Sequence, residues 1–285
     1  MKRYRLLNLY ILPLLLTALL IGGCSDDDAS SLIQQDNALT LQVSAQDFAY
    51  GAGTRATDAG YTTAFETGDA IGVSVVVDGE LVQNNIRCEY NGTTWTPDDA
   101  LYKYNGATYF AVYPYNADNT ALQYTAADSV VAFFTPDVDQ STIEKYQAND
   151  LMTATVTNLT SQVLSFKMSH AMSLVEVTIP YQSYQAGTGV IYQPSALENF
   201  YIGSIGHDNI EPYQVSTTDK YCTYRCIVKS IVGMDMANRH SISGTYTTFL
   251  GKEKNFIDTN LLLEGNKYYR ILVSDADADT PIPMN

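Results

Sequence analysis

Tryptophan, histidine and basic residues are scarce in this chain. Its 285 residues include one tryptophan, three histidines and 16 lysines and arginines against 31 aspartates and glutamates, and the formal net charge is -15. Nucleic acid and anionic membrane surfaces repel a chain of this charge, so we expect neither as a partner. Tyrosine is abundant, with 22 residues. This composition is typical of exposed β-structure, and it predicts an all-β surface protein.

Cysteine is also rare, and its pattern indicates no disulfide framework. Of the four cysteines, Cys24 is assigned another role below, which leaves Cys88, Cys222 and Cys226, an odd number. Two residues four apart on a strand lie roughly 13 Å apart, which is too far for a disulfide. We therefore predict that Cys222 and Cys226 are small buried apolar side chains rather than a zinc pair.

The sequence lacks the common motifs of catalysis. It contains no Gly-x-Ser-x-Gly elbow and no glycine-rich phosphate loop. The three histidines, His170, His207 and His240, do not have the partner spacing of a metal site. The alternating aspartates in residues 275–279 resemble the first ligand positions of a calcium-binding loop, but the glycine and the distal glutamate of such a loop are missing. We therefore interpret these aspartates as part of a solvated tail. We expect no enzymatic activity, no metal and no cofactor.

The N-terminus has the organisation of a lipoprotein signal. Three basic residues within the first five positions precede an apolar run over residues 6–21, which is short for a membrane span. Small residues then lead to Cys24, and an acidic, serine-rich stretch follows it. We predict a signal peptide at 1–23, a covalent lipid on Cys24 and a solvated tether at 24–37. The alternative is a generic secretory signal whose cysteine is accidental.

The next stretch predicts one strand followed by a flexible loop. Residues 38–44 alternate apolar and polar with period two, as in a half-buried strand. The apolar positions are Leu39, Leu41 and Val43. The glycine-containing loop at 51–57 carries one basic residue, Arg55, which is followed by Ala56. Such a loop is accessible to proteases, so we predict cleavage between Arg55 and Ala56; the alternative is an ordinary loop arginine.

The pattern of the remaining sequence predicts strands separated by turns. Asp78-Gly79 and Asn91-Gly92 are hairpin dipeptides between apolar runs, and only residues 141–148 indicate a helix. The strands are expected near 70–77, 86–90, 107–115, 130–134, 150–157, 162–179, 200–205, 221–232, 241–250, 256–263 and 267–274. This spacing favours β-sandwiches, and we place an N-terminal domain at 38–160 and a C-terminal domain at 161–285.

Four landmarks, in this order, carry a family resemblance. They are Phe65-Glu66-Thr67-Gly68-Asp69-Ala70-Ile71-Gly72-Val73, Trp95, Tyr109-Phe110-Ala111-Val112-Tyr113-Pro114-Tyr115 and the run from Ser165 to Val177 that contains His170. Together they resemble the fimbrillin-like lipoproteins, which supply subunits of type V pili. The resemblance implies two tandem transthyretin-like β-sandwich domains.

The resemblance also implies a route of assembly. In that family a lipid delivers the subunit to the outer membrane, and a trypsin-like, arginine-specific protease removes the first strand. A strand from another pilus subunit then fills the vacated site. The stretch from Thr54 to Thr57 is similar to that cleavage site, so residues 38–55 are the expected removable part. The implied location is the fimbrium at the surface of the outer membrane.

The size of this effect follows from burial. Each of Leu39, Leu41 and Val43 contributes about 1.5–3 kcal/mol when buried, so losing the strand costs roughly 5–9 kcal/mol. That is comparable with the whole stability of a typical domain, about 5–15 kcal/mol. The C-terminal tail, with three acids and two prolines in residues 275–285, is a poor donor strand. A tip, anchor or accessory subunit is therefore as consistent with the sequence as a stalk subunit.

Two further hypotheses remain from the sequence. Asp128-Ser129-Val130 resembles a short motif for O-glycosylation, with Ser129 as the acceptor. The chain could also be a cell-surface lipoprotein that binds glycans for nutrient uptake, although its single tryptophan argues against a sugar-binding platform. The adhesive subunit would have a host or bacterial surface ligand, which the sequence does not identify.

Overall fold

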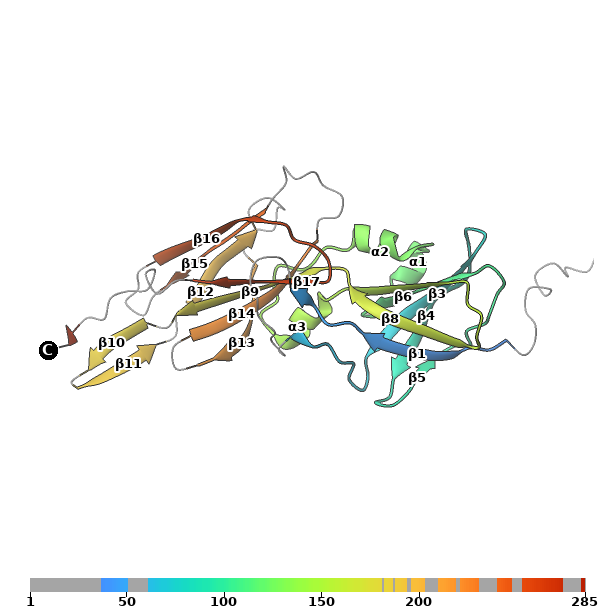
Figure 1. Cartoon of the computed structure of the whole chain (residues 1–285), viewed down its shortest axis with the longest axis horizontal. Coiled ribbons are helices and arrows are strands. Elements are labelled where there is room, and N and C mark those ends of the chain that lie inside the picture. The colour runs from blue at the N-terminus through green and yellow to red at the C-terminus, as the bar shows by residue number, and fades with distance from the viewer. Residues whose placement is uncertain are drawn as a thin grey trace, which may run out of the picture.

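A computed structural model describes residues 37–50, 61–180, 182–186, 188–193, 196–202, 210–218, 221–230, 240–247, 253–273 and 283–284. The predicted signal peptide, Cys24, Arg55, Ala56 and the acidic tail lie outside these residues. The fold is all-β and sandwich-like, with two groups of strands that follow one another along the long axis (Figure 1). In the described part of the chain, none of the helices has the length and apolar character needed to cross a membrane.

The first group is one seven-stranded sheet that curves around its own core. Its strand order is β1-β8-β7-β6-β3-β4-β5. The strands are β1 (Thr40–Ala45), β3 (Ala70–Val77), β4 (Glu80–Tyr90), β5 (Trp95–Pro97), β6 (Thr108–Tyr113), β7 (Met152–Thr157) and β8 (Val163–His170). Ile71, Tyr109 and Phe166 are almost fully buried inside it, together with Cys88. β1 runs parallel to β8 at one edge of the sheet.

Three short helices lie between β6 and β7: α1 (Asn119–Leu122), α2 (Ala127–Phe133) and α3 (Ile143–Ala148). The helix expected at 141–148 is confirmed by α3, whose N-cap Thr142 accepts a hydrogen bond from the Lys145 N–H. The strand expected at 130–134 is wrong, because this stretch belongs to α2. Its buried residues, Ala127 and Val130, have the three-residue spacing of one helix face.

The second group contains three smaller sheets. A five-stranded sheet has the order β13-β14-β9-β17-β2, and two three-stranded sheets have the orders β12-β15-β16 and β11-β10-β18. The strands are β2 (Ala49–Tyr50), β9 (Ser173–Pro180), β10 (Gln182–Ala186), β11 (Gly189–Gln193), β12 (Ala196–Ile202), β13 (Tyr213–Thr217), β14 (Tyr221–Val228), β15 (His240–Thr247), β16 (Glu253–Leu261), β17 (Lys267–Leu272) and β18 (Pro283–Met284). Cys222 and Cys226 are free and buried in this core, as predicted.

The chain passes from the first sheet to the second between β8 and β9, at Ala171 and Met172. The boundary expected at residues 160 and 161 assigns β8 to the second half, whereas β8 pairs with β1 and β7 in the first sheet. The strand count alone could not place β8, because its partner β1 lies more than a hundred positions earlier. We propose a division into two domains at Ala171–Met172.

A third apolar core joins the two groups. It contains Phe48, Phe110, Leu174 and Ile227, which come from both halves of the chain. Gln140 is fully buried beside it, where its side chain donates to the Ile227 carbonyl (2.9 Å) and accepts from the Ile227 N–H (2.7 Å). The two groups therefore meet through a packed and hydrogen-bonded junction rather than through a linker.

Candidate functional site

The described N-terminal segment, residues 37–50, contacts both halves of the molecule. Within β1, Leu39 and Leu41 are 9% and 7% exposed and Val43 packs against the first core. Thr40, Gln42 and Ser44 are exposed on the other face. The predicted period-two alternation is confirmed, and all three predicted apolar side chains lie on the core side.

The stretch from Asn37 to the end of β1 is hydrogen-bonded to two parts of the first half. On one side, the Thr40 N–H donates to the Gln162 carbonyl (2.9 Å) and the ladder continues along β8. On the other side, the Leu39 N–H donates to the Leu101 carbonyl (2.8 Å), and the Asn37 carbonyl accepts from the Lys103 N–H (2.9 Å). Residues 37–39 thus tie the start of β1 to residues 101–103, and loss of the segment would leave these residues and the edge of β8 with unpaired backbone groups.

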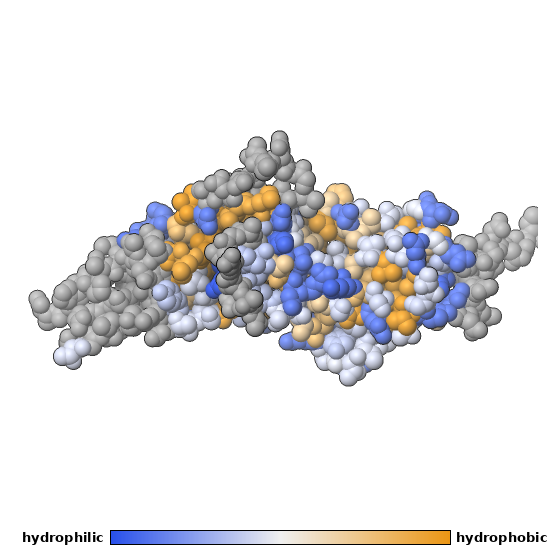
Figure 2. Space-filling view, viewed as in Figure 1, coloured by the Kyte–Doolittle hydropathy of each residue, from blue (hydrophilic) through white to orange (hydrophobic). Residues whose placement is uncertain are grey.

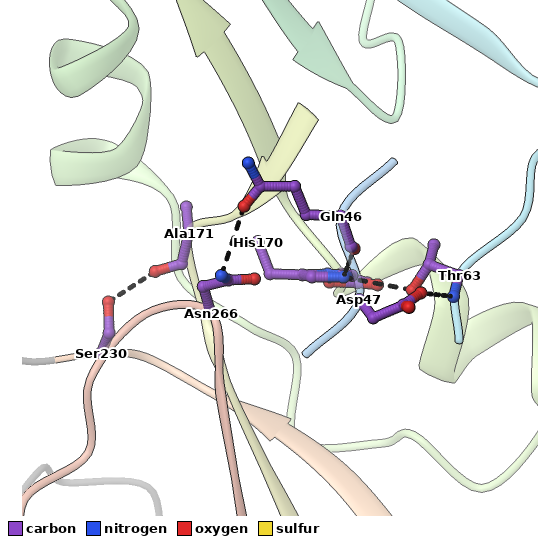
Figure 3. Close-up of polar contacts among 8 residues, drawn as sticks. Gln46, Asp47, Thr63, His170, Ala171, Ser230 and Asn266 are labelled. Carbon is purple, nitrogen blue, oxygen red and sulfur yellow. Dashed lines mark hydrogen bonds and ion pairs between the residues drawn. The ribbon is translucent and has the colours of Figure 1, made fainter. Parts of the chain in front are cut away.

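Beyond β1, the segment is held by His170, the last residue of β8. The His170 Nε2 lies 2.9 Å from the Gln46 carbonyl oxygen and 3.1 Å from the Thr63 Oγ1 (Figure 3). Its Nδ1 lies 2.7 Å from Asp150 Oδ1. The imidazole also stacks on the Phe48 ring, with the ring centroids 3.6 Å apart. This histidine, whose side chain is fully buried, therefore binds the segment through a hydrogen bond and a ring contact.

The segment then reaches the second half. The Ala49 N–H donates to the Asn266 carbonyl (2.8 Å), and β2 pairs in parallel with Lys267 and Tyr268 of β17. The Tyr50 ring packs edge-on against the Tyr268 ring at 4.8 Å. Figure 3 shows Gln46 next to Asn266, and close by the Ala171 carbonyl, which accepts from the Ser230 hydroxyl (2.5 Å). Residues 46–50 thus bridge the junction.

A buried ion network lies beside this bridge. Glu176 is 4% exposed and accepts from Arg225 Nε (2.8 Å) and Arg270 Nε (3.2 Å). The Arg225 guanidinium lies over the Tyr61 ring at 4.4 Å, and Tyr61 stacks on Tyr268 at 3.8 Å. Burial, and then the Glu176 carboxylate, raises the pKa of Tyr61 above its ordinary value. The network fixes Tyr61 and Tyr268 beneath the N-terminal segment.

A cavity of about 330 Å³ opens next to the junction. Aromatic rings and carboxylates line it, including Phe48, Tyr61, Phe65, Tyr113, Tyr146 and Asp150. The Tyr113 hydroxyl donates to Asp69 Oδ1 (3.1 Å). Burial, followed by Asp69, raises the pKa of Tyr113, so this hydroxyl stays protonated and available as a donor at neutral pH.

The structure brings some of the predicted site residues together and leaves others apart. Leu39, Leu41 and Val43 lie on β1, next to the junction residues that the sequence did not identify, above all Phe48. Ser129 lies on α2, half-buried, and precedes the buried Val130. Among the described residues, no group of three or more histidine, cysteine or acidic side chains could hold a metal ion. The sequence pointed to the junction only through His170, which lies within the run from Ser165 to Val177 that carries part of the family resemblance.

These features define the class of protein as an all-β sandwich whose first strand is held at a sheet edge and across a junction. A family model described as fimbrillin-like matches residues 54–268, and the chain belongs to the fimbrillin-like family. This family comprises structural and adhesive fimbrial proteins rather than enzymes.

Two relatives illustrate the similarity. A Bacteroides ovatus protein named as a fimbrium tip subunit, Fim1C, is 32% identical over 200 residues, which are 65% of this chain and 36% of that protein. A crystal structure of a fimbrial protein from Bacteroides ovatus superposes with a TM-score of 0.60 at 26% identity, and the match covers 83% of this chain and 48% of that one. The matched regions thus span about a third of the first relative and about half of the second.

Proposed function

We propose that this chain is a structural or adhesive subunit of a type V pilus that joins its neighbour by strand exchange. The observation that carries the proposal is the position of β1. It is a short parallel strand at a sheet edge, buried on one face, and Arg55 follows it in the sequence. Cleavage between Arg55 and Ala56 would free residues 38–55 while the rest of the sheet stays covalently intact.

The energetics favour replacement over simple loss. Removing Leu39, Leu41 and Val43 exposes their sites, which costs roughly 5–9 kcal/mol in lost burial. It also leaves unpaired backbone groups on β8 and on residues 101–103, which are hydrogen-bonded to residues 37–45 before cleavage. An extended strand with the same alternation of apolar and polar side chains restores both the apolar burial and the backbone hydrogen bonds, as in other cases of β-strand addition.

The proposed route to the surface uses the lipid on Cys24. The lipid anchors the subunit in the outer membrane, an arginine-specific protease trims it, and another pilus subunit supplies the replacing strand. The subunit then resides in the fimbrium at the cell surface, where it binds a host or bacterial surface ligand. Nucleic acid is not a partner, because the chain carries a net charge of -15.

A position at the end of the filament, as a tip, anchor or accessory subunit, agrees best with the available features. The similar protein Fim1C is named as a tip subunit, although the match spans only 36% of it. The tail at 275–285 carries acids and prolines that suit a donor strand poorly. Apolar side chains also reach the surface of the second half near β15 and β16 (Figure 2). Ile257 of β16 is 67% exposed, and a large apolar side chain in this position suits contact with a neighbour.

The direct test combines processing with assembly in cells. Filaments labelled with an antibody against this chain are counted by electron microscopy for the wild type, for Arg55→Ala and for the matched Arg87→Ala control. We expect labelled filaments in the wild type and the control and their loss in Arg55→Ala. Equal labelling of Arg55→Ala filaments would show that removal of the first strand is not required.

A second function, glycan binding at the cell surface for nutrient uptake, is supported by one feature. The junction cavity combines ring faces with carboxylates and the Gln147 amide, which together suit the apolar faces and hydroxyls of a sugar. A glycan array probed with the purified chain separates the two functions. Glycan binding that Tyr113→Ala abolishes would favour this second function. An array without signal would leave the pilus-subunit function as the one supported.

A further inference from the structure

The junction site, which we define as Thr63, Asp150, His170, Asn266 and Tyr268, contacts the N-terminal segment at two ring positions. Phe48 stacks on His170 with an interplanar angle of 16°, and Tyr50 packs edge-on against Tyr268. Residues two apart on an extended chain point to the same side. The junction site therefore receives two aromatic side chains, at positions i and i+2 of the N-terminal segment.

One backbone group of the segment also meets the junction site. The Gln46 carbonyl, two positions before Phe48, faces the His170 Nε2, while the Asp150 carboxylate faces Nδ1. A carbonyl and a carboxylate both accept hydrogen bonds, so both ring nitrogens must donate for both contacts to form. A ring that donates from both nitrogens satisfies this requirement.

Other titratable groups surround this ring. From the N-terminal segment, Asp47 accepts a hydrogen bond from the Thr63 N–H (3.0 Å). Tyr113 of β6 and Tyr146 of α3 lie near Asp150, and burial followed in part by carboxylates, Asp150 among them, raises the pKa of both. Arg225 lines the same cavity but is bound to Glu176. Acidic groups thus predominate around His170.

We propose that the junction site selects the strand that replaces the N-terminal segment. The selected strand is an extended segment of another protein subunit that carries an aromatic residue facing His170 and a second one two positions later facing Tyr268. His170 is the positioning residue, because its Nε2 fixes the register by donating to the carbonyl two positions before the first ring. This inference rests on the proposed strand exchange. Residues 274–285 of this chain contain no aromatic residue, so they do not fit the site.

The positioning role predicts that replacing the imidazole loosens the segment. A buried hydrogen-bond acceptor that loses its donor corresponds to roughly a tenfold change or more in an equilibrium constant. The segment should accordingly open about tenfold more readily when the His170 imidazole is replaced.

The first test uses the uncut full chain and does not depend on processing. Amide exchange of Gln46 and Ala49 is measured by NMR in the wild type and in each variant and corrected for the intrinsic rate. These N–H groups donate to the Met168 and Asn266 carbonyls in the intact segment. We expect about tenfold faster exchange in His170→Asn and Asp150→Asn than in the wild type, and no change in the control His207→Gln. Wild-type exchange in His170→Asn would overturn the role of this ring.

Two substitutions of Phe48 separate ring stacking from simple burial. Phe48→Leu keeps an apolar side chain without a ring face, and Phe48→Trp keeps the ring. We expect about tenfold faster exchange of the two amides in Phe48→Leu and near wild-type exchange in Phe48→Trp. Equal exchange in the two variants would mean that the site recognises apolar volume and not rings.

The second test concerns selection itself. The chain is cut with an arginine-specific protease and its mass is checked, and then it is offered fluorescent peptides that copy residues 40–50. We expect the peptide with leucine at both aromatic positions to bind at least tenfold more weakly than the native sequence, and a Ser44→Ala peptide to bind equally well. Equal binding of the leucine peptide contradicts the proposed selection. Failure of any peptide to enter the cut chain would contradict the proposed function itself, while the exchange experiment on the uncut chain still tests the junction site.

Discussion

The imidazole of His170 lies parallel to the phenyl ring of Phe48, with 3.6 Å between the ring centroids. Gln46, which is 124 positions from His170 in the sequence, is hydrogen-bonded to the same imidazole. These contacts occur where the first sheet ends and the second begins. The N-terminal segment therefore completes the first sheet through β1 and also joins the two halves through residues 46–50.

Truncating β1 on its core side should destabilise the first half. Leu41→Ala removes a side chain that is 7% exposed, and such substitutions cost about 2–5 kcal/mol because they leave a cavity. The control Thr40→Ala alters the exposed face of the same strand and should cost about 0.5 kcal/mol or less. Urea unfolding of the purified chain measures both. Equal destabilisation by the two variants would contradict the burial of this face.

Neutralising Glu176 should destabilise the junction strongly. Glu176→Gln leaves two guanidinium groups without their buried carboxylate, and breaking a buried ion pair costs about 3–5 kcal/mol. The matched control Glu89→Gln breaks the exposed pair with Arg87, for which we expect a far smaller change because water screens such pairs. Chemical denaturation separates the two variants. Unfolding of both variants at the same urea concentration would contradict the larger effect expected for Glu176→Gln.

Cys88 should resist alkylation in the folded chain at pH 8. Burial raises the pKa of the Cys88 thiol to about 12, and only the thiolate reacts rapidly. The thiol therefore remains protonated at pH 8, and labelling requires opening of the first core. We expect no iodoacetamide adduct on Cys88 in native buffer and complete labelling in urea, as measured by peptide mass spectrometry. Rapid labelling of Cys88 in native buffer would show that the first core is open.

A methyl group at Gly265 should weaken the junction. A Cβ there would lie 2.8 Å from the Ala171 carbonyl oxygen, so the turn before β17 would have to shift by a few tenths of an ångström. The adjacent Asn266 carbonyl accepts from the Ala49 N–H. We expect Gly265→Ala to accelerate amide exchange at Ala49, whereas the neighbouring control Glu264→Ala should leave it unchanged. Unchanged exchange in Gly265→Ala would show that the turn absorbs the methyl group.

The sequence predicted the parts of this structure that depend on local pattern. The period-two alternation placed Leu39, Leu41 and Val43 on the core side, and the apolar runs gave most strands of both halves. The strand expected at 130–134 failed because the spacing of Ala127 and Val130 fits a helix face that a short apolar run does not reveal. The junction was beyond prediction, because Phe48 and His170 meet only once β1 has paired with β8. No local pattern records that contact.

The central claim is that the first strand is removed at the cell surface, and the mass of the surface form tests it most directly. One spectrum of the purified surface protein reports the lipid on Cys24, cleavage after Arg55 and any glycan on Ser129. We predict that the assembled form begins at Ala56 and that a lipidated precursor beginning at Cys24 accompanies it. A surface population that consists entirely of chains beginning at Cys24 would contradict this account.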